Sequence, residues 1–186
     1  MLGWRVFLAA IVTTVLGCHG EAVDAVIADA GHDAPAGVEL LNNPGFELGC
    51  AAWETGEATA EESTIARSGS RSCRVCAMPG VGAYFFSQAV EGVAVGTKYL
   101  GEAWLRADDG AAGVAPDPTG RLELLDKNMD QIDIAEVGTL ALDKTWKRTS
   151  ALITVKPGTD KLRLEFWSHG PGTCFLIDDA SLRVVP

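Results

Sequence analysis

The chain has 186 residues, of which 47% are hydrophobic, 22% charged and 7% aromatic, and these values are typical of a globular protein. This composition excludes a disordered chain, a collagen-like fibre and a polytopic membrane protein. Acidic residues outnumber basic ones by 25 to 15, so the formal net charge is −10. Because nucleic-acid binding requires clustered positive charge and no Lys/Arg-rich block occurs, we expect no nucleic-acid partner.

Residues 1–17 have the features of a secretory signal peptide. Arg5 is their only charged residue, and the run from Val6 to Leu16 is almost entirely apolar. That run is shorter than the roughly 20 residues needed to cross a bilayer, but it fits the apolar core of a signal peptide. The sequence Val15-Leu16-Gly17-Cys18 resembles the lipobox of bacterial lipoproteins, which implies cleavage before Cys18 and diacylglycerol on its sulfur. A plain signal peptide with a chance cysteine is the alternative.

Residues 18–37 are expected to be a disordered acidic tether that begins at the acylated Cys18. Residues 19–37 contain four acidic residues, no Lys or Arg and no aromatic residue. Such a segment buries too little apolar surface to offset the entropy cost of folding. The alternative is a short helix over residues 22–30. Together with the lipid, this segment predicts an exported protein held to the membrane at the bacterial cell envelope, at the outer membrane or cell surface.

Residues 38–186 are predicted to form one all-β domain. Short apolar runs alternate with turn signals, which favours an antiparallel β-sandwich or barrel. The expected strands include residues 100–105, 121–125, 151–155, 162–167 and 175–185. Residues 126–137 are the one weak helical candidate, and a strand with a turn is the preferred interpretation there.

Several motifs in this domain, taken in order, resemble the carbohydrate-binding modules of the family 4, 9 and 22 group. They are Leu41-Asn42-Asn43-Pro44-Gly45-Phe46-Glu47, Trp53, residues 68–75, Tyr99 with Ala103-Trp104-Leu105-Arg106, Trp146 and residues 177–182. The likeness covers residues 39–184 and implies a jelly-roll β-sandwich of the galactose-binding-like type. It implies a ligand only loosely, because one fold hosts many functions. Trp53 and Trp146 match framework positions, and Cys73 stands where the family generally has an apolar residue.

Four cysteines remain in the domain, namely Cys50, Cys73, Cys76 and Cys174. In an exported protein this even number predicts two disulfides. Cys73 and Cys76 are three residues apart on one expected strand, so they point to opposite faces and do not pair with each other. Two pairings remain, of which Cys50–Cys76 with Cys73–Cys174 is preferred. The alternative of a metal or redox C-x-x-C site lacks the second closely spaced cysteine pair that zinc sites usually have.

The resemblance also implies a structural calcium ion. Its modules commonly hold one Ca²⁺ between the first and last strands, and the matching carboxylates here are Glu47, Asp178 and, as the next candidate, Asp179. Ca²⁺ prefers several oxygen ligands, and backbone carbonyls of residues 68–71 are expected to complete the shell. The alternative is that these carboxylates cap backbone amides or face solvent.

A sugar-binding face is expected from the two-residue alternation of the strands. Residues 99–106, 121–125 and 161–168 each place charged groups on one side, and two of these strands add a Trp there. Aromatic plates and planar polar groups are what a sugar site needs. The predicted contacts, if the strands share a sheet, are Trp104, Arg106, Glu123, Arg163, Glu165, Trp167 and Tyr84, with Phe86 and Gln88 beside Tyr84. The alternatives are a core role for Trp104 and ordinary surface ion pairs for the charged residues.

No catalytic constellation is apparent in the sequence. The G-x-S-x-G, H-E-x-x-H and P-loop motifs are absent, and His169 with its neighbour Ser168 is not a triad. We therefore expect no enzyme, but a lipoprotein that binds a glycan or polysaccharide at the cell envelope. The alternative function is a protein–protein or envelope-structural module that uses the same face, with an envelope protein as partner.

Overall fold

The computed structural model describes residues 37–109 and 117–186. The expected signal peptide, the lipidation site at Cys18 and nearly all of the tether therefore lie outside the described residues. Within them there is no helix at all, and so none that is long and apolar enough to cross a bilayer.

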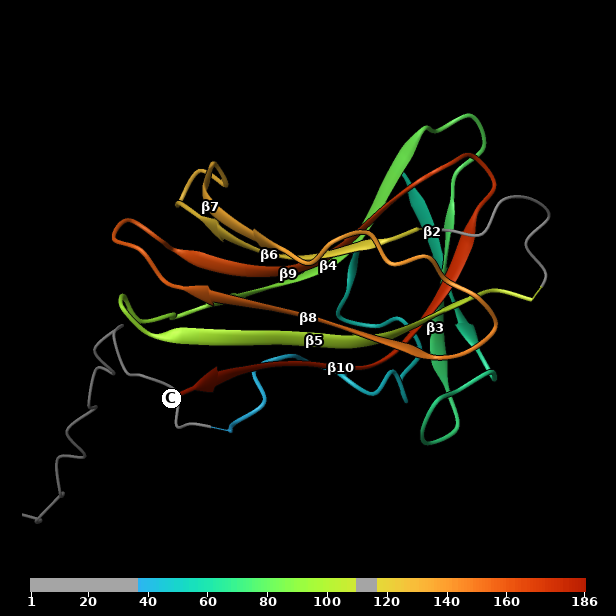
Figure 1. The fold of residues 1–186 in the computed structure, drawn as a ribbon, viewed down its shortest axis with the longest axis horizontal. Helices are drawn as coiled ribbons and strands as arrows, with labels where there is room; N and C mark the ends of the chain where they lie inside the picture. The colour runs from blue at the N-terminus through green and yellow to red at the C-terminus, as the bar shows by residue number, and fades with distance from the viewer. Residues whose placement is uncertain (1–36, 110–116) are drawn as a thin grey trace, which may run out of the picture.

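The described residues form two five-stranded antiparallel sheets, which Figure 1 shows as two layers. The β9 sheet has the order β1 (Glu54–Gly56), β4 (Ala83–Glu91), β9 (Lys161–His169), β6 (Thr119–Leu125) and β7 (Gln131–Glu136). The β10 sheet has the order β2 (Ala58–Ser63), β3 (Ser72–Ala77), β10 (Cys174–Val185), β5 (Lys98–Ala107) and β8 (Lys147–Thr154). The predicted all-β jelly-roll sandwich is confirmed.

Strand alternation divides the side chains between the core and two outer surfaces. In β9 the side chains of Leu162, Leu164 and Phe166 are buried, while Arg163 and Trp167 on the other side are partly exposed. The alternation expected for residues 99–106, 121–125 and 161–168 is confirmed in each strand. The preference for strand over helix is also correct, because residues 126–130 form the turn between β6 and β7.

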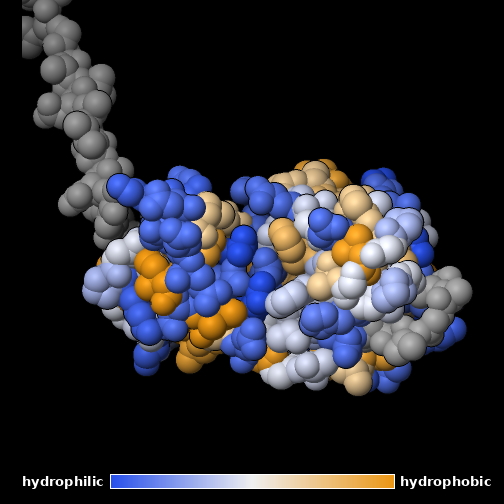
Figure 2. Space-filling model, turned by 90° about the horizontal axis from the view of Figure 1, so that it is seen from above, coloured by the Kyte–Doolittle hydropathy of each residue, from blue (hydrophilic) through white to orange (hydrophobic). Residues whose placement is uncertain are grey.

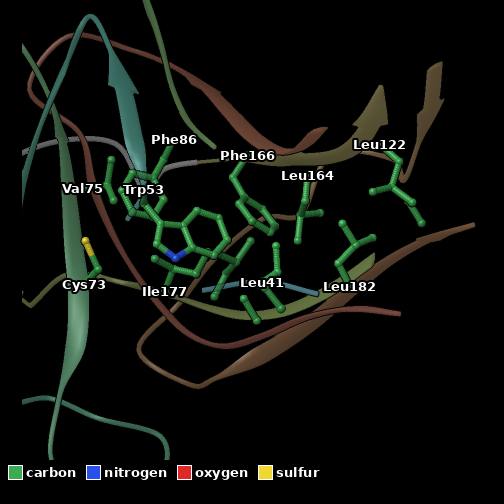
Figure 3. Packing of buried hydrophobic residues seen from close by; sticks show 14 of the residues in the cluster. Leu41, Trp53, Cys73, Val75, Phe86, Leu122, Leu164, Phe166, Ile177 and Leu182 are labelled. Carbon is green, nitrogen blue, oxygen red and sulfur yellow. The ribbon is translucent and has the colours of Figure 1, made fainter. Parts of the chain in front are cut away.

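Aromatic rings fill the core between the two sheets (Figure 3). The Trp53 ring stacks on Phe86 with 5.1 Å between centroids and a 6° interplanar angle. Phe46 lies 5.2 Å from the same indole, and Phe166 lies 6.4 Å from it. Trp53 is therefore a structural residue, as its framework position implies.

The first described residue lies at one end of the sandwich. The Gly37 amide donates to the Val184 carbonyl, beside the end of β10. The turn that connects β8 to β9 lies at this same end. Thr154, the last residue of β8, pairs with Lys98, and Lys98 pairs with Val185 at the end of β10. β9 starts at this end with Lys161 and runs away from it. Trp167 therefore lies toward the end of the sandwich that is far from Gly37.

Candidate functional site

The predicted sugar contacts lie on both outer surfaces of the sandwich rather than on one. Glu123, Arg163, Glu165 and Trp167 lie on the outer surface of the β9 sheet, which we call the β9 face. Trp104 and Arg106 belong to β5 in the other sheet, and they lie on its outer surface, the β10 face. The expectation that all these strands share a sheet is therefore wrong. Alternation indicates which side of a strand faces out, but not which sheet the strand joins.

The assignment of Tyr84 to the sugar-binding face is also wrong. Its ring is 1% exposed, stacks on Phe175 at 6.0 Å and lies 3.1 Å from the Thr173 hydroxyl through its own oxygen. Burial raises the pKa of this phenol. Phe86 and Gln88 point inward with Tyr84, and Gln88 accepts a hydrogen bond from the Asn42 amide. The alternate residues of β4, Phe85 and Ser87, are the ones that point to the β9 face.

Phe85 is the aromatic residue that β4 contributes to the β9 face, and the sequence analysis missed it. The strand register places Phe85 opposite both Gly56 of β1 and Trp167 of β9, and Trp167 opposite Thr119 of β6. These four residues form a line across the sheet that we call the aromatic row. A Cβ on Gly56 would lie 1.9 Å from Phe85 Cε1, so the ring occupies the space that a side chain would take.

Next to the aromatic row, the β9 face carries two arginines and two glutamates that bond to one another. Arg121 lies opposite Glu165, and Glu123 lies opposite Arg163. Arg121 Nε is 2.7 Å from Glu165 Oε1 and 3.0 Å from Glu123 Oε1. Arg163 Nε is 2.7 Å from Glu123 Oε2 and 3.4 Å from Glu165 Oε2. We call these four residues the charged quartet.

Both carboxylates of the quartet are buried beneath the guanidinium groups. Glu123 and Glu165 are 1% exposed, whereas the side chains of Arg121 and Arg163 are 15% and 22% exposed. Burial raises the pKa of Glu165, and the nearby Glu123 carboxylate raises it further, while both arginines lower it. Because each buried carboxylate bonds to cations, the quartet is a satisfied network.

The quartet also holds the aromatic side chains in place. The Arg121 guanidinium carbon lies 4.7 Å from the ring centre of Trp167, and that of Arg163 lies 6.0 Å from the ring centre of Phe85. These distances are within the range of cation–π contact. The exposed His169 ring lies 5.0 Å from Trp167 on the other flank. Trp167 is thus pre-oriented, yet its side chain remains partly exposed.

Arg121 and Ser87 are further residues of the β9 face that the sequence analysis did not select. Arg121 belongs to the charged side expected for residues 121–125, but it was not among the predicted contacts. Ser87 lies opposite both Glu54 and Glu165, and its buried hydroxyl has no hydrogen-bond partner among the described residues. Period-two alternation with the correct parity would have found Ser87 together with Phe85.

On the β10 face, the two predicted sugar contacts, Trp104 and Arg106, already interact with other residues of the protein. The Arg67 guanidinium carbon lies 3.8 Å from the ring centre of Trp104, and Arg67 also pairs with Asp179. Arg106 donates to the Lys144 carbonyl at 2.8 Å and pairs with Asp109. These contacts tie loops to the sheet, so we interpret Trp104 and Arg106 as structural.

The carboxylates expected to bind calcium accept hydrogen bonds from the 67–71 turn. Glu47 accepts bonds from the Ser70 amide and hydroxyl at 2.9 and 2.7 Å. The bond from the Ser70 hydroxyl is the main reason that the pKa of Glu47 is lowered. A Cβ on Gly69, whose φ is +61°, would lie 2.0 Å from Glu47 Oε1, so this turn requires glycine.

Asp178 and Asp179 hold the other side of the same turn. Asp178 accepts bonds from the Arg67 and Ser68 amides at 2.7 and 3.2 Å, and burial raises its pKa. Asp179 accepts a bond from the Ser68 hydroxyl at 2.7 Å. Across residues 37–109 and 117–186, no three His, Cys, Asp or Glu side chains gather into a group able to hold a metal. As arranged here, amide and hydroxyl donors satisfy these carboxylates, and the calcium site stays a prediction.

The two disulfides are Cys50–Cys73 and Cys76–Cys174. The predicted opposite orientation of Cys73 and Cys76 is correct, but the preferred pairing is wrong. Cys73 points into the core, whereas Cys76 lies directly opposite Cys174 on the outer side of the β10 sheet. The pairing of β3 with β10 decides the connectivity, and no local pattern in the sequence specifies that pairing.

One hollow between the sheets is too small to hold a ligand. The hollow lined by Gly101, Gly120 and Thr149 between the sheets has no room even for a water molecule. Figure 2 shows the molecule from above, on the side of β6, β7 and β9 in Figure 1, with hydrophilic and hydrophobic residues intermingled. On the β9 face, the rings of Phe85 and Trp167 beside the charged quartet suit a ligand that has both apolar faces and hydroxyl groups.

No family model matches the sequence, and no curated protein matches it significantly. Solved structures share the fold. The xylan-binding CBM22-1 domain of Paenibacillus barcinonensis Xyn10C is 20% identical with a TM-score of 0.65, over 82% of this chain and 97% of that one. TmCBM61 in complex with β-1,4-galactotriose is 21% identical with a TM-score of 0.54, over 80% and 99%. The enzymatically active domain of bacteriophage CBA120 tailspike protein 4 is 14% identical with a TM-score of 0.65, over 80% of this chain but 22% of its own.

Proposed function

We propose that this chain, which has the jelly-roll fold of carbohydrate-binding modules, is a non-catalytic protein that binds a glycan or polysaccharide on its β9 face. The observation that carries the proposal is the partly exposed Phe85 and Trp167 beside the charged quartet. Aromatic rings pack against the apolar face of a sugar ring, and the neighbouring guanidinium groups donate hydrogen bonds to its hydroxyl groups.

Preorganisation supports this use of the face. The guanidinium groups of Arg121 and Arg163 are fixed by the buried carboxylates of Glu123 and Glu165 before any ligand arrives. A ligand therefore does not have to order these long side chains, whose immobilisation would otherwise weaken binding. The N–H groups that point away from the carboxylates are the donors we assign to the sugar.

The solved structures support a glycan as the class of ligand without selecting one sugar. One similar domain binds xylan, and another was solved with a β-1,4-linked galactotriose. Because two different sugars occur on the same fold, we propose the class and leave the sugar to experiment. A protein partner for the β9 face is the alternative function.

Display at the cell envelope through a lipid on Cys18 is part of the proposal. The N-terminal segment joins the sandwich at the Val184 end, while β9 carries Trp167 toward the opposite end. A tether that leaves from the Val184 end would hold the aromatic row away from the membrane. Globomycin-sensitive processing and incorporation of labelled palmitate into the wild type, but not into Cys18→Ala, test the anchor.

The glycan proposal is tested with a panel of xylohexaose, cellohexaose and β-1,4-galactotriose and the purified full-length protein. Trp167→Ala is expected to weaken binding by about tenfold or more, equivalent to about 1.4 kcal/mol. The matched control Trp104→Ala removes the same ring from the opposite face and should leave affinity unchanged. A panel that does not bind the well-folded protein, or equal losses in both variants, would contradict the assignment and favour the protein partner.

We also propose, from the family resemblance alone, that calcium binds where Glu47 and Asp178, with Asp179 as the next candidate, meet the 67–71 turn. The chemistry that a bound ion supplies there is structural, since it would link the first and last segments through oxygen ligands. The test is the melting temperature in calcium and in a chelator. Bound calcium is expected to raise it, and identical values would contradict the proposal.

A further inference from the structure

We infer that the β9 face takes an uncharged glycan and rejects one that carries carboxylate or sulfate groups. This inference rests on the proposed glycan-binding function and adds the charge class of the ligand. It follows from how the cations of this face are already used.

Each guanidinium in the charged quartet is shared between two carboxylates of the protein. Arg121 lies within 3.0 Å of both Glu123 and Glu165, and Arg163 lies within 3.4 Å of both. The two positive and two negative charges therefore balance within the quartet. Its remaining N–H groups donate well to neutral hydroxyl oxygens, but no net positive charge is available to neutralise an anion.

The rim of the face adds negative charge. Glu136 pairs across from Arg121 with 3.9 Å between Oε1 and Nη1, and Glu54 lies at the edge beyond Ser87. Lys161, the remaining cation of the described β9-face strands, pairs with Glu91 at 2.9 Å. The described strands of this face contain five glutamates but only three lysines and arginines. The glutamates are Glu54, Glu91, Glu123, Glu136 and Glu165.

An anionic sugar would meet a double penalty here. Its carboxylate would reach the outward N–H groups of Arg121 and Arg163, but Glu123 and Glu165 lie beneath these groups and already balance their charge, so little net attraction offsets the desolvation of the anion. To give the anion a full positive charge, Arg121 or Arg163 would have to turn away from a buried glutamate, which is strongly unfavourable. A neutral sugar meets neither penalty, because a hydroxyl oxygen accepts an N–H bond without displacing a carboxylate.

The inference is tested by calorimetric titration of the full-length protein with the neutral oligosaccharides of the panel and with hexagalacturonate, at low and at high salt. We expect a neutral oligosaccharide to bind with an affinity that changes less than about twofold with salt, since no net charge is neutralised. Hexagalacturonate should bind at least about tenfold more weakly at low salt, the result of like-charge juxtaposition.

A rim variant sharpens the test and leaves all four residues of the buried quartet in place. Glu136→Gln removes one exposed charge from the face, and it should strengthen binding of hexagalacturonate about twofold, the size expected for one exposed charge. Glu61→Gln removes a similarly exposed charge from β2 in the other sheet, and it should have no effect.

The outcomes separate this inference from the proposed function. If hexagalacturonate binds as tightly as the neutral sugars, or more tightly with an affinity that falls in salt, the inference is wrong while glycan binding stands. If neither type of sugar binds, both the inference and the proposed function are wrong. Preference for a neutral sugar, independent of salt, supports both.

Discussion

The two outer faces of the sandwich contain the same types of residue and use them differently. Each has a tryptophan beside arginines and glutamates, Trp167 on the β9 face and Trp104 on the β10 face. On the β9 face the arginines bond to glutamates of the same sheet. On the β10 face Arg67 comes from a loop and covers Trp104, and Asp179 binds Arg67 in turn. Residue type alone therefore does not distinguish a binding face from a surface that fastens loops.

Exposure of the arginines is the physical difference between these faces. Glu102 at the centre of the β10 face bonds to Arg148 and Arg183, whose side chains are 53% and 36% exposed. Water reaches those arginines, so their pairing adds little stability. In the charged quartet the arginines are far less exposed, and each pairing is part of a closed network. Rigid polar groups beside partly exposed rings are what a sugar site requires.

The largest expected effect comes from opening the quartet. Glu123→Ala leaves a buried cavity and only the Glu165 carboxylate to pair with both Arg121 and Arg163. Because this leaves buried positive charge without a partner, we expect a loss of about 3–5 kcal/mol in the free energy of unfolding. Glu102→Ala, the matched change on the β10 face, should cost only about 1 kcal/mol because its arginines remain hydrated. Urea denaturation of both variants measures the difference.

Equal losses in Glu123→Ala and Glu102→Ala would show that the two charge clusters are energetically alike, and the distinction between the faces would not hold. Glu123→Gln keeps the shape of the side chain and separates loss of charge from loss of volume. It should destabilise the protein less than Glu123→Ala.

A smaller effect is expected when the loop over Trp104 is released. Arg67→Gln removes the cation–π contact and the pairing with Asp179, and it should lower the free energy of unfolding by about 1 kcal/mol. Glycan affinity should stay within about twofold of the wild type, because the β9 face is untouched. A loss of affinity in Arg67→Gln, measured by calorimetry, would place the ligand on the β10 face instead.

The smallest effect concerns the pH dependence of the 67–71 turn. The pKa of Glu47 is lowered from 4.5, chiefly by the Ser70 hydroxyl, so the folded state favours the ionised carboxylate. The stability that this provides is present above pH 4.5 and is lost as the pH falls through the lowered value. Glu47→Gln should therefore melt at a lower temperature than the wild type at neutral pH, with a difference that disappears in acid. A difference that is constant with pH would contradict this role, and Ser70→Ala is the matched change at the donor.

Local patterns in the sequence predicted the fold and the facing of individual strands. Alternation predicted that residues 161–168 place their charged groups on one side, and this is confirmed, since Arg163 points outward while Leu164 and Phe166 are buried. Alternation was misleading in β4, where aromatic residues stand on both sides, and there Tyr84 was chosen in place of Phe85. Gln88 stands on the same side as Tyr84 and is polar, but it is buried because its side chain bonds to the Asn42 backbone.

What local patterns do not specify is which strands become neighbours. The separation of Trp104 from Trp167 and the pairing of Cys76 with Cys174 both follow from the order of strands within the sheets. That order is decided by contacts between residues far apart in the sequence. Four of the seven predicted contacts therefore lie together on the β9 face, and the other three depended on strand order or on the parity of β4.

The most direct test is an amide chemical-shift map of the full-length protein, titrated with the oligosaccharide of the panel that binds most tightly. The predicted result is a set of shifts centred on Phe85, Arg121 and Trp167, in strands β4, β6 and β9, with Trp104 and its neighbours in β5 unchanged. Shifts centred on β5 and β10, around Trp104, would contradict the assignment of the β9 face as the glycan-binding surface.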